Sequence, residues 1–125
     1  MRLHWTVLAC MVVAQAAAAQ NSDKMVDVKV VNGVIKVSPD PVTVSKQQNR
    51  IRWQLSTAGY SFPSTGIVIK AGGQEYGDCG LMPNSSTAYV CKKLKHIDRK
   101  EYKYDVTLLG SGGQALTLDP VIRND

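Results

Sequence analysis

The sequence contains few of the residues from which active sites and metal centres are built. Only two histidines occur among its 125 residues, and there is no Cys-x-x-Cys pair and no Gly-x-Ser-x-Gly turn to present a nucleophile. The 10 Asp and Glu residues are scattered, so no carboxylate pair for acid and base catalysis can be located. These absences lead us to expect a protein that is not an enzyme and that holds no metal or other cofactor.

Long apolar runs are absent beyond the first 20 residues, whereas a membrane-spanning helix needs about 20. Residues 1–20 carry an early cation at Arg2, an apolar run over 5–14 and an alanine tract over 16–19, the order of a secretory signal peptide. We therefore expect one mature domain over 21–125, periplasmic or secreted, with no transmembrane segment. Lipid anchoring at Cys10 is disfavoured, because the apolar segment before it is too short.

The charge of the predicted mature domain is mildly positive. Removing Arg2 lowers the 15 Lys and Arg residues to 14, against 10 Asp and Glu. A net charge of +4 favours acidic surfaces but does not by itself indicate nucleic acid. The domain is large enough to bury a core and small enough to benefit from a covalent tie.

Two cysteines remain in the mature domain, Cys79 and Cys91. Because both follow an export signal, they should reach an oxidising compartment, where a disulfide is the default expectation. The closed loop is short, so the bond should stabilise the fold by roughly 3 kcal/mol. A metal pair or a redox pair is the alternative, and no second cluster of Cys or His supports it.

Alternating apolar and polar residues predict short β-strands separated by Gly, Pro and Asn turns. Asn32-Gly33 is typical of a tight hairpin turn, and the prolines of 38–41 should interrupt the next strand. We expect mostly irregular surface over 74–86, and a loop with at most one helical turn over 92–100. The expected strands are 26–31, 34–37, 42–44, 50–55, 66–70, 87–91, 101–109 and 115–120.

Seven to eight short strands without a convincing helix predict an all-β fold, a Greek-key β-sandwich. The run Ile35-x-Val37-x-Pro39-x-x-Val42-x-Val44, followed by Ile51-x-Trp53, resembles the opening strands of cupredoxin-like domains. Tyr102-x-Tyr104-x-Val106 resembles their penultimate strand, and the segment 118–124 is similar to the tail of small exported bacterial proteins. An immunoglobulin-like sandwich is the alternative.

The resemblance to cupredoxins implies copper held by two histidines, a cysteine thiolate and usually a methionine. This sequence departs from that pattern, because His96 is the only histidine of the mature part and no Cys, His or Met follows Tyr104. Cys91 is better used in the disulfide. The resemblance therefore points to a copper-less member of this fold.

A basic run is the most distinctive surface feature, and His96 within it reads as an ordinary surface histidine. Its candidate binding residues are Lys92, Lys93, Lys95, His96, Arg99 and Lys100. They either form a solvated loop and strand edge or a docking patch for an acidic protein, an anionic polysaccharide or lipid head groups. Asp98, Glu101 and Asp105 dilute the charge, and the nearby tyrosines should face inward, which disfavours nucleic acid.

We therefore expect a non-enzymatic binding module of the cell envelope. A small secreted inhibitor of a hydrolase is the alternative, with the disulfide-bounded segment 80–90 as the inserting loop. A metal-dependent redox protein is a third, less favoured possibility. Trp53 is expected in the core, with Tyr60 and Phe62 as packing anchors, in preference to an exposed aromatic platform for sugars.

Overall fold

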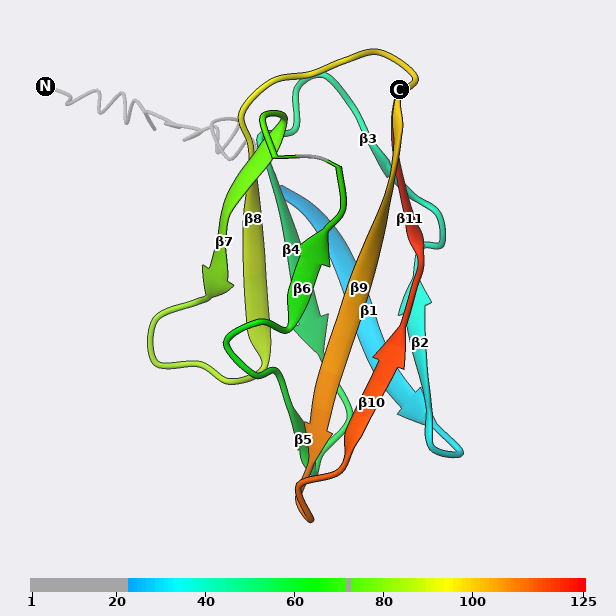
Figure 1. Cartoon of the computed structure of the whole chain (residues 1–125), viewed down its shortest axis with the longest axis vertical. Helices are drawn as coiled ribbons and strands as arrows, with labels where there is room; N and C mark the ends of the chain where they lie inside the picture. Colours follow the sequence, from blue (N-terminus) through cyan, green and yellow to red (C-terminus); the bar gives the residue numbers. More distant parts are fainter. Residues whose placement is uncertain (1–22, 72) are drawn as a thin grey trace, which may run out of the picture.

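The computed structural model describes residues 23–71 and 73–125, and over these ranges the chain forms eleven β-strands and no helix. The strands make two mixed sheets that pack face to face as a β-sandwich (Figure 1). The predicted signal peptide, residues 1–20 with Cys10, lies outside the described residues. Within those ranges there is no helix with the length and apolarity to cross a membrane.

The first sheet has five strands and carries its apolar side chains on alternate positions. β1 runs parallel to β4, and the other pairs are antiparallel. Asn32 and Gly33, at φ 53° and 75°, form the predicted tight turn between the first two strands. In spatial order the strands are β2 (Val34–Ser38), β1 (Asp23–Val31), β4 (Arg50–Leu55), β8 (Ala88–Lys93) and β7 (Tyr76–Leu81).

The second sheet is organised around one long strand, β9 (Glu101–Gly110). Four short strands pair antiparallel with it, and the remaining strand, β3, pairs parallel with β11. These strands are β5 (Tyr60–Ser61), β6 (Ile67–Ile69), β10 (Ala115–Leu118), β11 (Val121–Asn124) and β3 (Val42–Val44).

The core lies between the two sheets and is centred on β4 and β9. Trp53 of β4 and Tyr104 of β9 are fully buried, with ring centroids 5.4 Å apart. The Trp53 indole Nε1 donates a hydrogen bond to the Tyr104 hydroxyl over 3.2 Å. This bond satisfies a polar group that would otherwise be buried without a partner. Phe62 is buried and Tyr60 packs against the core, so the aromatic residues expected inside are there.

The structure confirms the all-β sandwich and most of the predicted strands, but it has eleven strands where seven or eight were expected. The segment 74–86 was wrongly expected to be irregular, because β7 forms within it. Asp78 has φ 50°, and the register with β8 shifts between Gly77 and Gly80. The Gly and Asp residues that suggested a turn therefore form a bulge inside a strand.

Near the end of the chain one expectation holds and one changes. The segment 92–100, expected to be a loop with at most one helical turn, forms no helix: β8 ends at Lys93, and the loop after it contains a turn in which the Lys100 amide donates to the Ile97 carbonyl. The predicted final strand over 115–120 ends at Leu118, and the chain continues into β11 after Pro120. Pro120 lacks the amide hydrogen that a continuous strand would use, which explains the break.

Replacing Tyr104 with phenylalanine tests the bond between the sheets. We expect Tyr104→Phe to lower the free energy of unfolding by about 1–3 kcal/mol, because the buried Trp53 N–H loses its acceptor. Urea unfolding followed by tryptophan fluorescence measures the loss. The matched control is Tyr60→Phe, since Tyr60 is only half-buried. Equal losses in the two variants would contradict the assigned role of the hydrogen bond.

Candidate functional site

The structure separates the six residues of the predicted basic patch. Lys92 lies on the outer face of the five-stranded sheet, opposite Arg50 in the register and 3.9 Å from a carboxylate oxygen of Asp78. Lys95 and Arg99 are exposed on the loop that follows β8, and neither forms an ion pair within residues 23–71 and 73–125. Only these two retain the open cationic character that the sequence suggested for all six.

Lys93 and His96 point into the protein, although they belong to the same basic run. The Lys93 ammonium donates to the carbonyl of Ser45 over 2.7 Å and lies 2.8 Å from Nδ1 of His96. Nε2 of His96 lies 2.8 Å from the main-chain oxygen of Asp125, and only 8% of the His96 side chain is exposed. The expectation of an ordinary surface histidine was therefore wrong.

Lys100 is also engaged, because it neutralises a buried carboxylate. Its ammonium lies 2.6 Å from Glu75, which is only 7% exposed, and 5.2 Å from the centre of the Tyr102 ring. The Tyr102 hydroxyl donates to the same carboxylate over 3.0 Å. The hydrogen bond from Lys100, followed by that from Tyr102, lowers the pKa of Glu75. Burial, followed by the bond to Glu75, raises the pKa of Tyr102 to about 12.

Asn124 completes this network, and sequence reasoning missed it. The Asn124 side chain is fully buried, accepts a hydrogen bond from the Tyr76 hydroxyl over 2.7 Å and donates to the Ile97 carbonyl over 3.0 Å. It thereby ties β11 to the loop over 94–100, which we call the cap loop. In Figure 1 this loop arches over one end of the sandwich, beside the C label. We call this end, closed by Glu75, Tyr76, Lys93, His96, Lys100, Tyr102 and Asn124, the polar end.

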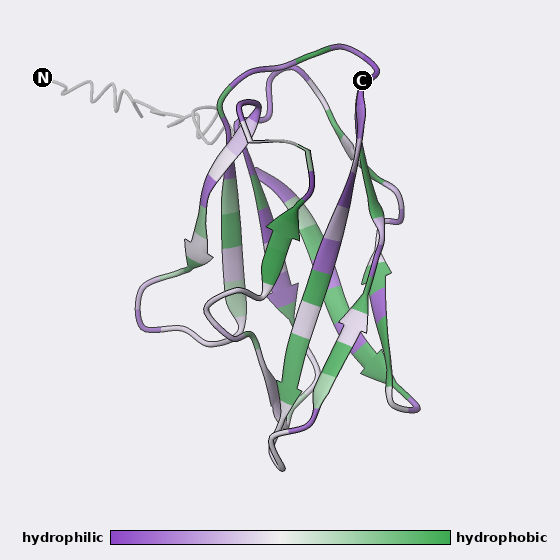
Figure 2. Ribbon diagram, viewed as in Figure 1, coloured by the Kyte–Doolittle hydropathy of each residue, from purple (hydrophilic) through white to green (hydrophobic). Residues whose placement is uncertain are grey.

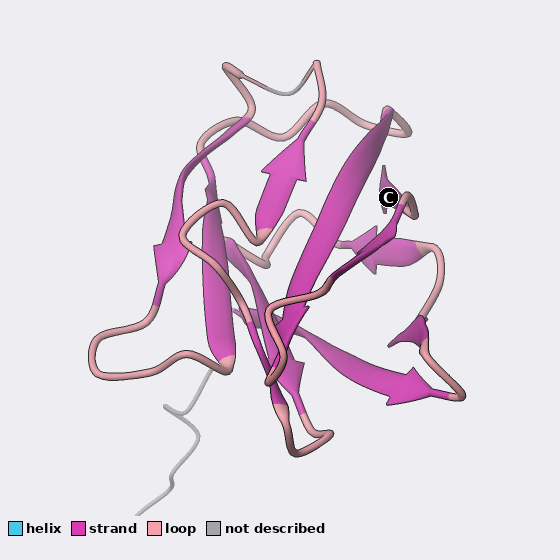
Figure 3. Ribbon diagram, turned by 60° about the horizontal axis from the view of Figure 1, so that its bottom comes forward, coloured by secondary structure: helices cyan, strands magenta, loops and turns pink. Residues whose placement is uncertain are grey.

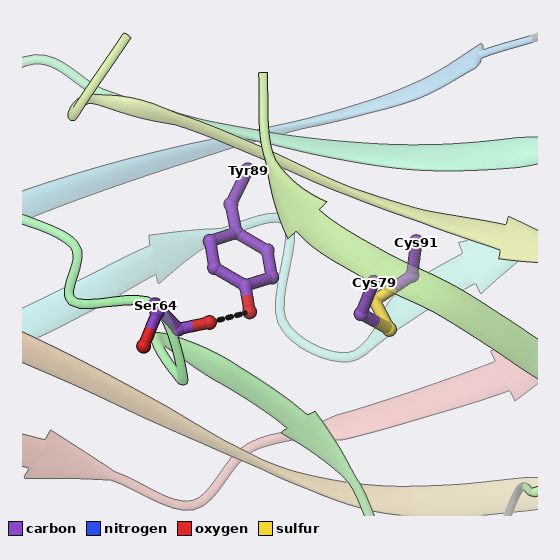
Figure 4. Close-up of a disulfide and its surroundings, with 4 residues drawn as sticks. All are labelled: Ser64, Cys79, Tyr89 and Cys91. Carbon is purple, nitrogen blue, oxygen red and sulfur yellow. Dashed lines mark hydrogen bonds between the residues drawn. A yellow bond between two sulfur atoms is a disulfide. The ribbon is translucent and has the colours of Figure 1, made fainter. Parts of the chain in front are cut away.

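The predicted disulfide between Cys79 and Cys91 is present and joins β7 to β8. Cys91 is fully buried and Cys79 is exposed. The bond crosses the part of the hairpin where the ladder is interrupted by the bulge. Figure 4 shows Tyr89 nearby, whose hydroxyl donates to the Ser64 carbonyl over 2.6 Å. The disulfide and Tyr89 therefore fix the hairpin from two sides.

The connection between β7 and β8, within the predicted inserting segment 80–90, is a tight turn. The Ser85 amide donates to the Met82 carbonyl over 3.1 Å, with Pro83 and Asn84, at φ 58°, in the central positions. Proline followed by a residue with positive φ is typical of a type II turn. The Ser85 hydroxyl then accepts the amides of Thr87 and Ala88 over 3.1 and 3.0 Å. The turn is therefore rigid while its tip is exposed.

Neighbouring segments hold the base of this turn. The Ser86 carbonyl accepts the Phe62 amide, and the Thr87 carbonyl accepts the Leu55 amide, each over 2.8 Å. The Val30 amide donates to the Thr57 hydroxyl over 2.9 Å, and Tyr60 pairs with Gly110 in the ladder. The turns at this end of the sandwich are thus connected to one another by hydrogen bonds, most of them between backbone groups. Figure 3 turns this end toward the reader.

These connected turns share one property, which is the absence of charge. Four segments without any Lys, Arg, Asp, Glu or His converge here, namely 30–35, 53–69, 79–91 and 106–118. We call the surface formed by their turns the charge-free end. It exposes Val31 and Val34, at 45% and 49%, and a shallow pocket of about 190 Å³ beside Tyr60 and Ser111. Figure 2 shows hydrophilic residues along the loops near the C label, at the polar end.

The donors that a copper centre of the cupredoxin type needs do not fit here. Cys91 is bonded to Cys79 and cannot supply a thiolate, and both ring nitrogens of His96 face protein groups. No group of three or more His, Cys, Asp or Glu side chains suited to a metal occurs in residues 23–71 and 73–125.

Comparison of the chain with protein-family models and with curated protein sequences finds no match to either.

Removing the disulfide tests how much the β7–β8 hairpin depends on it. We expect the double variant Cys79→Ala, Cys91→Ala to lose roughly 3 kcal/mol of unfolding free energy, because its unfolded chain is less restricted. Guanidinium unfolding measures this, and the wild type unfolded with a thiol reductant should match the variant. An unchanged unfolding midpoint in both samples would contradict the assigned role of the bond.

The Glu75 network should make stability depend on pH. Because the folded protein lowers the pKa of Glu75, the stabilisation is present above the unfolded carboxyl pKa of about 4.3 and is lost as pH falls through the lowered folded value. We expect Glu75→Gln to be less stable than wild type at pH 7, with the difference shrinking toward pH 3. Urea unfolding at each pH measures it. Glu101→Gln, which alters an exposed pair with Arg123, is the control.

Proposed function

We propose that this chain is a non-enzymatic, exported binding module that contacts an uncharged partner surface through its charge-free end. The observation that carries the proposal is the convergence of four uncharged segments on connected, rigid turns. The centres of protein interfaces are depleted in charged residues. Loops that present Ser, Gly, Asn and Tyr on a β-sandwich are also the arrangement used for recognition by antibody domains.

Rigidity supports this assignment because it lowers the entropic cost of binding. The turn over 82–85 is held by its own hydrogen bonds, by the carbonyls of Ser86 and Thr87 and by the disulfide behind it. A loop that is already ordered loses little conformational freedom when a partner binds. The surface needs no rearrangement to present Pro83 and Asn84 at its tip.

The basic run is a weaker candidate for the binding surface than the charge-free end. Two of its six residues are turned inward, one neutralises a buried carboxylate and Lys92 lies 3.9 Å from Asp78, which leaves Lys95 and Arg99 as its open cations. The hydrolase-inhibitor alternative is also less favoured, because the type II turn reverses the chain within four residues. An inhibitor that mimics a substrate would present extended backbone instead.

The expected export fits this function. The segment over 1–20 has the order of a signal peptide, and a disulfide is typical of oxidising compartments such as the periplasm or the exterior. We therefore propose that the partner is another component of the envelope or of the surroundings of the cell.

Introducing charge at the proposed surface tests the function. The variant Ser86→Arg, Ser111→Arg places cations on two exposed positions of the charge-free end. The control Lys95→Glu, Arg99→Glu reverses the open cations of the polar end. We expect an envelope protein or glycan captured by the wild type, at low and moderate salt, to bind the first variant at least about tenfold more weakly. An unpaired charge buried in an interface costs several kcal/mol, and 1.4 kcal/mol is tenfold.

The same partner, purified, should bind the control variant as it binds the wild type. Loss of binding in the control alone, together with strong weakening by salt, would assign the contact to the basic residues instead. Thermal unfolding of both variants verifies that neither has lost its fold.

A further inference from the structure

The atoms around the Lys93 ammonium indicate where the protons of Lys93 and His96 lie. Three acceptors surround its Nζ, namely the carbonyls of Ser45 and Lys46, over 2.7 and 3.4 Å, and Nδ1 of His96, over 2.8 Å. An ammonium group has three protons to donate, so the three acceptors match a charged Lys93. Burial lowers the pKa of Lys93. Three acceptors around the ammonium nevertheless favour its charged form, so Lys93 keeps the proton.

This assignment determines the tautomer of His96. If Lys93 donates to Nδ1, that nitrogen carries no proton, and the single ring proton of a neutral imidazole sits on Nε2. Nε2 then donates to the main-chain oxygen of Asp125, 2.8 Å away. Neutral His96 therefore joins the cap loop to Asp125, after β11, while Lys93 joins the end of β8 to His96 and to the loop between β3 and β4.

A second proton on His96 does not fit this arrangement. It would have to bind Nδ1, the atom that accepts from Lys93, and it would place two positive charges 2.8 Å apart. Four charged groups belong to the segments around the ring: Lys93 from β8, Asp98 from the cap loop, Asp125 after β11 and Lys46 between β3 and β4. Asp98 Oδ1 is 3.4 Å from Nε2 and its side chain is largely exposed, so it offers a charged ring an alternative partner.

We propose that the pair of Lys93 and His96 is an acid-sensitive latch: protonation of His96 from solvent breaks its contact with Lys93 and moves the ring toward Asp98. The proton comes from solvent and forms an N–H bond at Nδ1, no bond between heavy atoms changes, and the polar end gains one positive charge. The backbone on both sides of His96 stays attached, because the amides of Leu94 and Lys95 donate to the Glu75 carbonyl and Asn124 donates to the Ile97 carbonyl. The movement is therefore confined to the His96 side chain.

The latch changes which cations the polar end presents. In its closed state Lys93 and His96 are turned inward, and Lys95 and Arg99 are the open cations of the basic run. In its open state a charged His96 lies beside these two residues, and Lys93 loses one of its three acceptors. Mild acid therefore assembles a denser basic surface than neutral pH does, independently of the charge-free end.

NMR of the mature protein with labelled histidine tests the first step. At pH 7.5 the ¹⁵N shifts of His96 should place the ring proton on Nε2, and a proton on Nδ1 would overturn the proposal. Amide hydrogen exchange tests the opening, with Gln48 and Asp125 as reporters, because these amides close the two segments that the latch joins. After correction for the chemical exchange rate, we expect about tenfold faster opening at pH 5.5 than at pH 7.5.

Two variants separate the latch from general acid instability. His96→Gln keeps an acceptor and a donor but cannot be protonated, so opening at Gln48 and Asp125 should no longer depend on pH. A response equal to that of wild type would overturn the proposal. Asp98→Asn removes the partner of the charged ring, so the midpoint of the response should move to lower pH, and an unchanged midpoint would refute the movement toward Asp98. Val106, deep in β9, is the reference amide.

Discussion

The contact between Trp53 and Tyr104 places the two sheets relative to one another. β4 pairs with β1 and β8, and β9 pairs with the four short strands β5, β6, β10 and β11. The two strands that carry this contact are therefore the ones on which most other pairings depend. An indole N–H buried between sheets needs an acceptor, and the only polar atom that Tyr104 brings to the core supplies it. Shifting either strand by one residue would turn every inward side chain to the outer face and would break this bond.

The two ends of the sandwich are closed by different means. At the polar end, strand termini carry charged side chains, and their burial is compensated by Lys100 on Glu75 and by the carbonyls and imidazole around Lys93. At the other end, tight turns and backbone hydrogen bonds close the core, so no charge is needed there. The asymmetry of charge over the surface thus follows from how the ends are closed. It leaves one end suited to contacts from which water and charge are excluded.

Alternation in the sequence predicts β1, β4 and β9 because one face of each is buried and the other is not. The Asn32-Gly33 turn and the disulfide follow from local chemistry in the same way. The same reasoning does not predict β7, because the Gly and Asp residues that normally mark a turn form a bulge inside this strand. The basic run was misjudged for a related reason: Lys92 and Lys93 are neighbours in a strand and point to opposite faces, which spacing of charges alone does not reveal. The four uncharged segments can be identified in the sequence. Predicting that they meet at one end of the sandwich requires the direction of each strand, which the sequence does not show.

The strand β8 links the two ends, with Lys93 at one terminus and the tightly held Thr87 just before the other. Coupling between distant sites needs an element with two arrangements that both sites influence. Between the ends, β8 is paired on both sides with β4 and β7, and Cys91 is tied to Cys79. Its ladder with β4 is continuous from Arg50 to Gln54, so a movement of His96 has no second register into which to shift the strand. A change at the polar end should therefore alter the charge presented there while the turns of the charge-free end keep their geometry.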